Sequence, residues 1–206
     1  MKKFLSKKVL LAGSIGIVLG VLVLLGIRFA TYSGLDQVHY HANFAIYVNG
    51  VRQEFKGFQY YEETAAEICT LHPIDSPKER AHMHDNINSV VHVEDHLVTW
   101  GNFMQNLGWG MGDDYLKTSD AMYTNDGQGK LSFILNGKPI ESVAGKIIQD
   151  KDQLLISYGT ESSDQLQKEY KTVPATAVKY DTSKDPASCG AGHSSVTTSE
   201  RLHHLL

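Results

Sequence analysis

The sequence predicts an α+β fold in which one helix packs across a mixed β-sheet. Three observations predict this fold. Two pairs of short apolar segments are each joined by an Asn-Gly dipeptide, at positions 49–50 and 136–137, and this dipeptide is the strongest short-range signal for a β-hairpin. The segment 99–108 has the apolar spacing of an amphipathic helix. A last apolar segment, Leu154 to Tyr158, predicts one further strand.

An uncharged apolar run of 19 residues extends from Val9 to Ile27. At about 1.5 Å per residue, a helix of this length spans a hydrocarbon core about 30 Å thick. Four lysines precede the run and Arg28 follows it. The positive-inside rule therefore predicts a single-pass protein of the plasma membrane, with a cytoplasmic tip over 1–8, a transmembrane anchor over 9–29 and an extracytoplasmic remainder.

A cleaved signal peptide is the alternative to this anchor. The apolar run is long for a signal peptide, and Arg28-Phe29-Ala30 lacks the small-x-small pattern of a cleavage site. We therefore expect the helix to be retained.

The net charge of the chain, −4, conceals a difference between its parts. After the five cations of the first 30 residues are set aside, 14 basic and 23 acidic residues remain, a formal net charge of −9. An acidic domain of this kind attracts cations and repels nucleic acid, so we expect no nucleic-acid partner. The chain contains 42% apolar residues, enough for a compact core, and only 2 Cys, too few for a multi-disulfide scaffold.

Val38 to Val48 is expected to form a strand with two unlike faces. One face carries Phe44, Ile46 and Val48, and the other carries His39, His41, Asn43 and Tyr47. Val51 to Phe55 is expected to return as a second strand after the Asn-Gly turn. Residues 56–87 are expected to be irregular.

Asn88 to Val93 predicts a third short strand. Thr99 is a suitable N-cap for the helix that follows, and Gly108 suits its C-terminal end. The apolar positions of this helix are Trp100, Phe103, Met104 and Leu107. Residues 109–129 are rich in glycine and aspartate and are expected to be a loop.

Leu131 to Leu135 and Lys138 to Glu141 are expected to form the second hairpin. A short polar helix is expected within 161–171, and the Ser/Thr-rich residues 172–206 are expected to form a loosely ordered tail. The extracytoplasmic domain is therefore assigned to 36–160, and the polar helix with its tail to 161–206.

The order hairpin, insertion, helix, strand, turn, strand resembles a β-grasp (ubiquitin-like) layout with a His-rich insertion. The stretch from Leu131 to Tyr158 is similar to the second half of the small sulfur-carrier proteins of that fold. Those carriers end in Gly-Gly, whereas this sequence ends in His-His-Leu-Leu, so their activity is not implied.

The clustering of the histidines indicates a functional site. Seven of the 10 histidines lie between His39 and His96. His39 and His41 form one H-x-H pair, and His82 and His84 form a second. On a strand, residues i and i+2 point to the same side about 6.5–7 Å apart, so both imidazoles of a pair can reach one ion.

We therefore expect a site for a divalent metal ion, Zn or Cu, because imidazole nitrogen is a favoured ligand of both. The candidate ligands are His39, His41, His82, His84, His92 and His72, followed by Cys69 and His96. Asp85, Glu94 and Asp95 are expected behind the ligands, where carboxylates orient imidazole rings.

Three functions fit this pattern. The first is an anchored domain that binds the ion for capture, buffering or stability. The second is a zinc-dependent hydrolase or hydratase, in which an open metal position lowers the pKa of a bound water and Glu94 acts as the base. The third is a structural surface-assembly protein whose histidines are incidental. An enzyme requires a concave pocket beside the metal, whereas a binding module predicts a filled or fully exposed site.

The two cysteines, Cys69 and Cys189, could form a disulfide in an oxidising exterior. Two free or differently paired thiols are the alternative. No C-x-x-C motif is present, so the sequence gives no support to thioredoxin-type exchange.

Several segments together resemble a family of uncharacterised, singly anchored surface proteins of small-genome bacteria and some archaea. The segments are 39–50, 82–85, 90–93, 99–108, 131–159 and 185–189. Some members of that family carry an automatic disulfide-isomerase label, which the missing C-x-x-C argues against here. In such relatives the segment matching 91–96 often contains His-x-His. This chain has Glu94 at the second of those positions, which makes Glu94 a candidate ligand or base.

Overall fold

The computed structural model describes residues 7–32, 38–61, 77–182 and 198–203. The chain divides into two units, Met1–Asp36 with Gly192–Leu206, and Gln37–Ala191. The first unit contains the long helix α1 (Lys7–Thr31) and the short helix α7 (Thr198–His203). Within α1, the 21 residues Leu11–Thr31 are long and apolar enough to cross a membrane, a property that a signal sequence shares.

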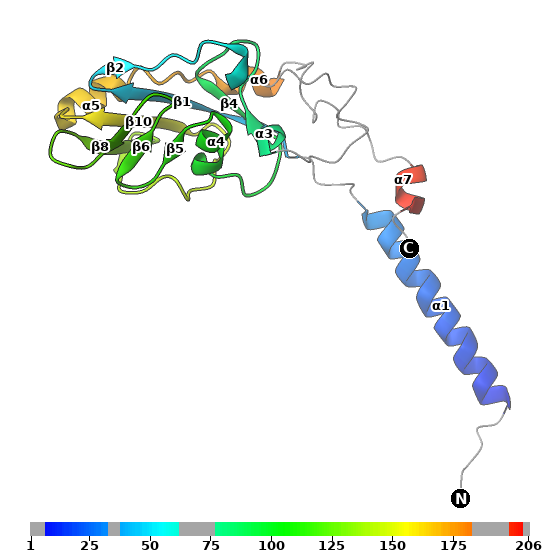
Figure 1. Ribbon diagram of the computed structural model, residues 1–206. Helices are drawn as coiled ribbons and strands as arrows, with labels where there is room; N and C mark the ends of the chain where they lie inside the picture. The colour runs from blue at the N-terminus through cyan, green and yellow to red at the C-terminus, as the bar shows by residue number, and fades with distance from the viewer. Residues whose placement is uncertain (1–6, 33–37, 62–76, 183–197, 204–206) are drawn as a thin grey trace, which may run out of the picture. The chain divides into compact units, whose positions relative to one another are not determined.

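The second unit is built on a mixed sheet (Figure 1). Its strands follow the spatial order β3-β4-β1-β10-β8-β9, and β2 pairs with β1. Neighbouring strands are antiparallel except β1 and β10, which pair in parallel. The strands are β1 (Tyr40–Val48), β2 (Val51–Arg52), β3 (Ala81–His82), β4 (Val90–Val93), β8 (Lys130–Leu135), β9 (Lys138–Ile140) and β10 (Gln153–Gly159).

One face of this sheet carries the main hydrophobic core. Phe44, Ile46 and Val48 of β1 point into it, as their alternation predicts. Helix α4 (Trp100–Asn106) packs against the same face, and its Trp100, Phe103 and Met104 are buried. Thr99 caps α4, because its side chain accepts a hydrogen bond from the Asn102 backbone N–H.

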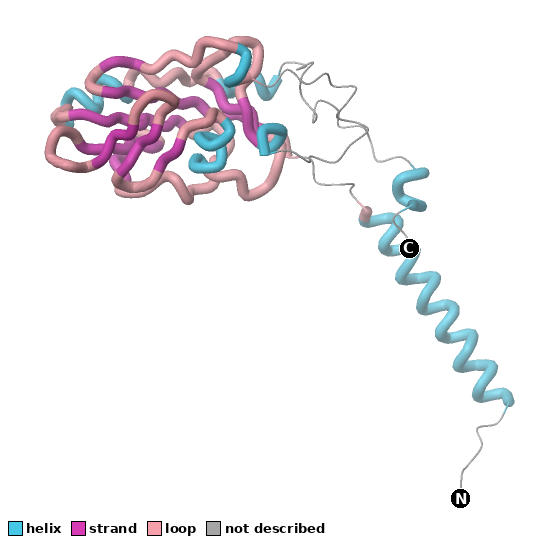
Figure 2. The backbone as a smooth tube through the Cα atoms, in the orientation of Figure 1, coloured by secondary structure: helices cyan, strands magenta, loops and turns pink. Residues whose placement is uncertain are grey.

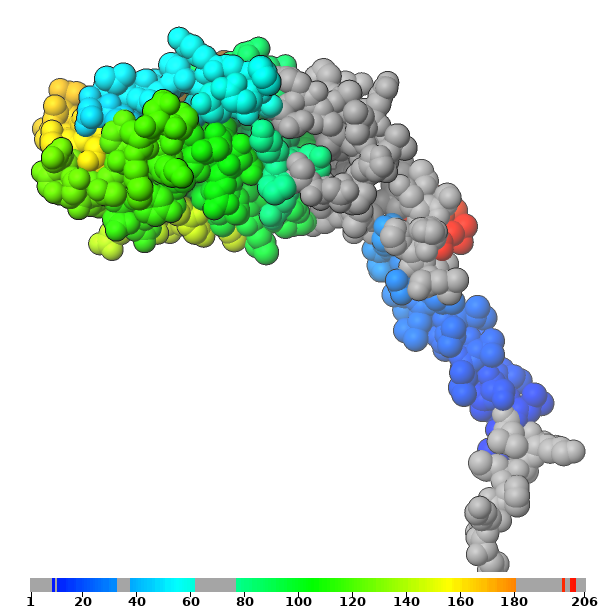
Figure 3. Space-filling view, in the orientation of Figure 1, coloured from blue at the N-terminus to red at the C-terminus, as the bar shows by residue number. Residues whose placement is uncertain are grey.

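A second small sheet lies in the same layer as α4 and corrects the loop expected at 109–129. It consists of β5 (Gly110–Met111), β6 (Tyr115–Lys117) and β7 (Met122–Thr124). Trp109, Met111 and Leu116 are buried in the main core, which holds these short strands in place. Their apolar alternation is too short to be distinguished from a loop in the sequence. Figure 2 marks these segments as strands, and Figure 3 shows the green residues of this layer covering the sheet.

Residues 56–87 also contain regular structure where none was expected. The structure places a 3-10 helix, η1 (Phe58–Tyr60), the helical turn α3 (Pro77–Arg80) and strand β3 in this segment. The two residues of β3 pair with β4 at the edge of the sheet. Pairing with β4, rather than the intrinsic preference of its two residues, makes this edge strand.

The opposite face of the sheet is covered by the segment that follows β10. Helix α5 (Ser163–Tyr170), capped by Ser162, packs with Leu166 and Tyr170 against Ala45, Ile134 and Leu155. Helix α6 (Ala177–Thr182) follows. Val173 and Ala177 are buried, so this part of the expected loose tail is packed against the domain.

Asn43 fixes this C-terminal segment to β1. Its side chain is buried on the face opposite the main core. The side-chain Oδ1 accepts hydrogen bonds from the backbone N–H groups of Thr176, at 2.9 Å, and Ala177, at 2.8 Å. The Nδ2 group donates to the carbonyl oxygen of Ser89 and to the hydroxyl of Thr176, both at 3.1 Å. One side chain of β1 therefore joins the start of α6 to the residue that precedes β4.

We expect Asn43→Ala to lower the free energy of unfolding by about 2–4 kcal/mol, because two backbone N–H groups lose their acceptor in a buried place. Urea denaturation followed by circular dichroism measures the loss. Gln105→Ala, on the exposed side of α4, is the control and is expected to change stability by less than about 0.5 kcal/mol. Equal stability of the two variants would contradict the role given to Asn43.

Candidate metal centre

Three histidines form a row across the edge of the sheet. In the β1–β4 pair His41 lies opposite His92, and in the β3–β4 pair His82 lies opposite His92. Directly opposite residues of neighbouring strands place their side chains on the same face about 5 Å apart. The register therefore brings His41 together with His82 and His92, two imidazoles that lie more than 40 residues later in the sequence.

Three more polar residues extend this row, because each lies two residues from a member of it. His39 precedes His41, His84 follows His82, and Glu94 follows His92. The residues that alternate with them on these strands point the other way, into or against the main core: Tyr40, Ala42, Ala81, Met83, Val91 and Val93. Alternation on all three strands thus puts apolar side chains on one face and histidines on the other.

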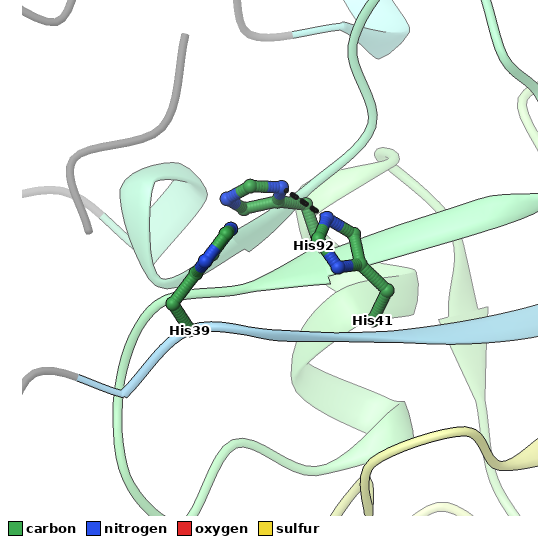
Figure 4. A group of neighbouring side chains, drawn as sticks. All are labelled: His39, His41 and His92. Atoms are coloured by element: carbon green, nitrogen blue, oxygen red, sulfur yellow. Dashed lines mark hydrogen bonds between the residues drawn. The ribbon is translucent and has the colours of Figure 1, made fainter. Parts of the chain in front are cut away.

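The five imidazoles are packed closely together. The ring centroid of His92 lies 4.5 Å from that of His39, 4.6 Å from that of His41 and 4.8 Å from that of His84. His82 stacks on His92 with centroids 5.0 Å apart. Within this cluster, one ligand atom from each of His39, His41 and His92 lies within 4.8 Å of the other two (Figure 4), so this group could bind a metal ion.

Nitrogen atoms converge on one edge of the His92 ring. His92 Nδ1 lies 2.9 Å from His41 Nε2 and 3.0 Å from His84 Nε2. His41 and His92 are essentially fully buried, and His82 and His84 are each 6% exposed. The convergence therefore occurs in a place largely removed from water.

Hydrogen bonds on the outer edges of the rings decide which nitrogens carry protons. His92 Nε2 lies 2.8 Å from Glu94 Oε1, and His84 Nδ1 lies 3.0 Å from Asp85 Oδ2. Because an ionised carboxylate only accepts hydrogen bonds, we assign the ring proton to the nitrogen that faces it. The inner nitrogens, His92 Nδ1 and His84 Nε2, then carry lone pairs.

His82 has a similar outer partner, the backbone carbonyl oxygen of Lys78, 3.0 Å from its Nδ1. A carbonyl oxygen also only accepts, so Nδ1 carries the proton and Nε2 the lone pair. These outer acceptors match those found behind the histidines of metal sites, where they fix the tautomer and orient the ring.

The cluster keeps His92 neutral. Burial lowers the pKa of His92 well below its ordinary value of 6.5, and the neighbouring His82, His41, His39 and His84 lower the pKa further. A neutral imidazole is the form that binds a metal ion. His92 is therefore held in its ligand form.

A small hollow lies beside the converging nitrogens. Its lining residues are His84, Ile87, Val90, His92 and Tyr180. It has room for about one water molecule. The Tyr180 ring, from α6, lies 5.7 Å from the His41 ring. The segment 172–182 thus carries a side chain to the edge of the cluster.

The structure places the other expected site residues as follows. His72, Cys69 and Cys189 lie outside the described residues. His96 is exposed beyond the end of β4. Asp95 was expected behind a ligand, but its carboxylate accepts a hydrogen bond from Arg80 Nε at 2.6 Å instead.

Two contributors to the site were not predicted. Lys78 takes part through its backbone carbonyl, which any residue would offer, so no sequence signal could identify it. Tyr180 lies in a segment expected to be a loose tail, and its only signal is an aromatic residue in a polar stretch. No family model, no curated protein and no solved structure was found to match this chain.

In the metal-free protein, stability is expected to fall as the pH drops below 6.5. Folded His92 stays neutral there, whereas His92 in the unfolded chain takes up a proton at its ordinary pKa of 6.5. The unfolded state then binds more protons, so the free energy of unfolding falls by up to about 1.4 kcal/mol per pH unit for this residue.

Urea denaturation in the presence of a chelator, at several pH values between about 8 and about 5, measures this slope. His92→Asn is expected to flatten the slope, and the exposed His96→Asn is expected to keep it. A slope that survives His92→Asn unchanged would assign the effect to other groups.

Proposed function

We propose that the domain Gln37–Ala191 binds one divalent Zn or Cu ion in the histidine cluster, with His39, His41 and His92 as its ligands and His84 beside them. The single observation that carries this proposal is that one ligand atom from each of His39, His41 and His92 lies within 4.8 Å of the other two. His92 Nδ1 lies at the centre of the cluster, 2.9 Å from His41 Nε2 and 3.0 Å from His84 Nε2. Lone pairs that face each other repel unless a positive ion lies between them. In the metal-free protein a proton on His41 Nε2 can reduce this repulsion, and a metal ion would displace that proton.

The spacing of the nitrogens supports an ion of this kind. Zinc binds imidazole nitrogen at about 2.0–2.1 Å in tetrahedral geometry, which separates two such nitrogens by about 3.3 Å. The His41–His92 nitrogen distance of 2.9 Å is a few tenths of an ångström shorter, so these two rings rotate outward to admit the ion. Charge also favours it, because the carboxylates of Glu94 and Asp85 behind two of the rings offset the two positive charges of the ion.

Zn(II) and Cu(II) fit the ligand set better than Cu(I), which prefers sulfur ligands. Met83 lies between His82 and His84 in the sequence but is buried in the main core, on the opposite face of the strand. Met104 is also buried in that core. The described residues around the cluster therefore offer nitrogen and oxygen, and no thioether.

Stable retention of the ion is the role that the geometry favours. The ligands come from the neighbouring strands β1 and β4 and from the residue next to β1, and His41 and His92 are almost completely buried. An ion held there would link β1 to β4, so binding contributes directly to stability. Glu94, the base required for a hydrolase, instead accepts a hydrogen bond from the outer nitrogen of His92, and the hollow beside the cluster holds about one water molecule.

The β-grasp fold, the membership of the anchored surface-protein family and the membrane topology expected from the sequence are also part of this proposal. The β-grasp assignment draws support from the central parallel pair β1–β10, flanked by antiparallel strands with α4 across one face. Membership of the anchored surface-protein family draws support from the residues quoted for it and from the apolar helix α1. An extracytoplasmic domain with a cytoplasmic N-terminus draws support from the lysines before that helix.

The full-length chain, purified in detergent, stripped with a chelator and supplied with Zn(II) or Cu(II), is expected to bind about one equivalent of metal and to melt at a higher temperature. Elemental analysis and thermal denaturation measure the two effects. His41→Ala and His92→Ala are expected to abolish both, whereas His96→Ala, with an exposed histidine outside the cluster, is the matched control and is expected to change neither. Binding well below one equivalent in the parent chain would refute the proposal.

A further variant, Glu94→Gln, measures how much the negative charge behind His92 contributes to metal affinity. Glutamine can still accept the hydrogen bond from His92 Nε2 but carries no charge, so metal affinity is expected to fall by about 10- to 100-fold without being lost. An affinity equal to that of the parent chain would show that Glu94 has no influence on the ion.

Retention of α1 as an anchor predicts that the chain stays in the membrane fraction after alkaline carbonate washing, with its first residues intact by N-terminal sequencing. Exchange of Leu19 and Leu24 for lysine in α1 is expected to release the chain, because each charge in the apolar core costs about 2.5–3.5 kcal/mol. Recovery of a soluble parent chain processed near residue 30 would identify a signal sequence instead.

A further inference from the structure

The C-terminal end of α1 is capped by a side chain from near the other end of the sequence. The last four carbonyl groups of a helix have no hydrogen-bond partner within the helix. In α1, the carbonyl of Arg28 accepts a hydrogen bond from the Tyr32 backbone N–H at 3.0 Å. The next two carbonyls, of Phe29 and Ala30, accept hydrogen bonds from Nη1 of Arg201 at 2.7 and 3.3 Å. Arg201, in α7, therefore completes the hydrogen bonding of this helix end.

Charge and aromatic contact favour the same placement of Arg201. The C-terminal end of a helix carries a partial negative charge, so a guanidinium is stabilised there. The guanidinium carbon also lies over the Phe29 ring, 5.9 Å from its centroid, which is within the range of a cation–π interaction. Two hydrogen bonds and one ring contact thus join α7 to α1, and both helices belong to one compact unit.

The capped carbonyls lie where the apolar part of α1 ends. Leu11–Thr31 is the stretch long enough to cross a membrane, so Phe29 and Ala30 belong to its last turn. A spanning helix leaves the hydrocarbon at such a turn, where a carbonyl without a partner is costly because little water is present. Arg201 is suited to this level, since a long basic side chain can reach into the boundary while its backbone stays outside.

The residue that follows Arg201 presents apolar surface at the same level. Leu202 is 57% exposed within the described part of the chain. Because Arg201 is bonded to the last turn of the apolar stretch, its neighbour in α7 cannot lie far from the membrane boundary. An apolar side chain at that boundary gains free energy by entering the region between headgroups and acyl chains.

We propose that α7 is a second contact of this chain with the lipid bilayer, in which Arg201 caps α1 and Leu202 enters the boundary between headgroups and acyl chains beside it. This inference rests on the proposed retention of α1 as an anchor. The metal-binding domain Gln37–Ala191 then lies, in the sequence, between two attachments to the same membrane. A cleaved α1 would leave Arg201 without the carbonyls that it caps.

The test uses the full-length chain in phosphatidylcholine vesicles prepared with and without bromine atoms on the acyl chains. Bromine quenches tryptophan fluorescence only at short range. Leu202→Trp adds a tryptophan to α7, and the parent chain supplies the background from Trp100 and Trp109, both buried in the main core. We expect brominated lipid to remove about half of the added emission or more, as for a side chain at the headgroup–acyl boundary.

Variants of Arg201 in the Leu202→Trp chain test the cap. Arg201→Ala removes both hydrogen bonds and the ring contact with α1, and we expect it to reduce the quenching by about twofold or more. Arg201→Lys keeps the charge and can still donate to both carbonyls, so it is expected to retain most of the quenching. Arg28→Ala is the matched control, because it removes a different cation from the same helix turn, and it is expected to leave the quenching unchanged.

Leu24→Trp, within the apolar stretch of α1, reports the anchor independently and is expected to be quenched by brominated lipid. Quenching of Leu24→Trp but not of Leu202→Trp would overturn the inference and leave the anchor standing. Equal quenching of Leu202→Trp with arginine or alanine at position 201 would also overturn it, since the lipid contact would not depend on the cap. Absence of quenching at both positions would refute the anchor as well.

Discussion

The structure depends on one constraint: three neighbouring strands keep the same two-residue alternation in a single register. On β3, β4 and β1 the residues between the histidines enter the core, while His82, His92 and His41 share the opposite face. Because the side-chain period of a strand is two, a slip of one residue in any pairing would exchange the two sets. It would bury imidazoles in the core and expose valines. The core thus fixes the cluster, since the apolar residues alone define the register that aligns the histidines.

The sheet is covered differently on its two faces, and this difference positions the site. The main core is closed by α4 and the small sheet β5-β6-β7, which pack aromatic and aliphatic side chains. The other face receives the segment after β10. Far from the cluster, α5 packs on apolar residues of the sheet and the hydroxyls of Tyr47 and Thr172 are hydrogen-bonded. Nearer the cluster, Asn43 holds the start of α6 through two backbone N–H groups.

The sequence allowed much of this to be predicted, and the limits have physical reasons. The alternation around His39 and His41, the Asn-Gly turns and the Thr99 cap act locally, so strand β1, both turns and helix α4 could be predicted. The contacts of His92 with both H-x-H pairs could not be predicted, because they depend on the registers in which β1 and β3 pair with β4. Strand β3 has two residues and no signal of its own, and Asn43 gives no indication that its side chain binds Thr176 and Ala177. Glu94 was expected either behind the ligands or as a ligand or base, and its Oε1, 2.8 Å from His92 Nε2, lies in the first of these positions.

The parallel pairing of β1 with β10 has a consequence for the order in which the domain is assembled. More than 100 residues separate the two strands, so β1 leaves the ribosome long before its central partner exists. During this interval β1 can pair only with β2, β4 and, through β4, β3. Of these strands, β1, β3 and β4 carry His41, His82 and His92. The half of the sheet that holds the cluster is therefore synthesised first, and loop closure over a long chain delays the rest. An ion captured at that stage would act as a folding template, since it would hold three marginal strands together until β10 and α6 arrive to enclose them.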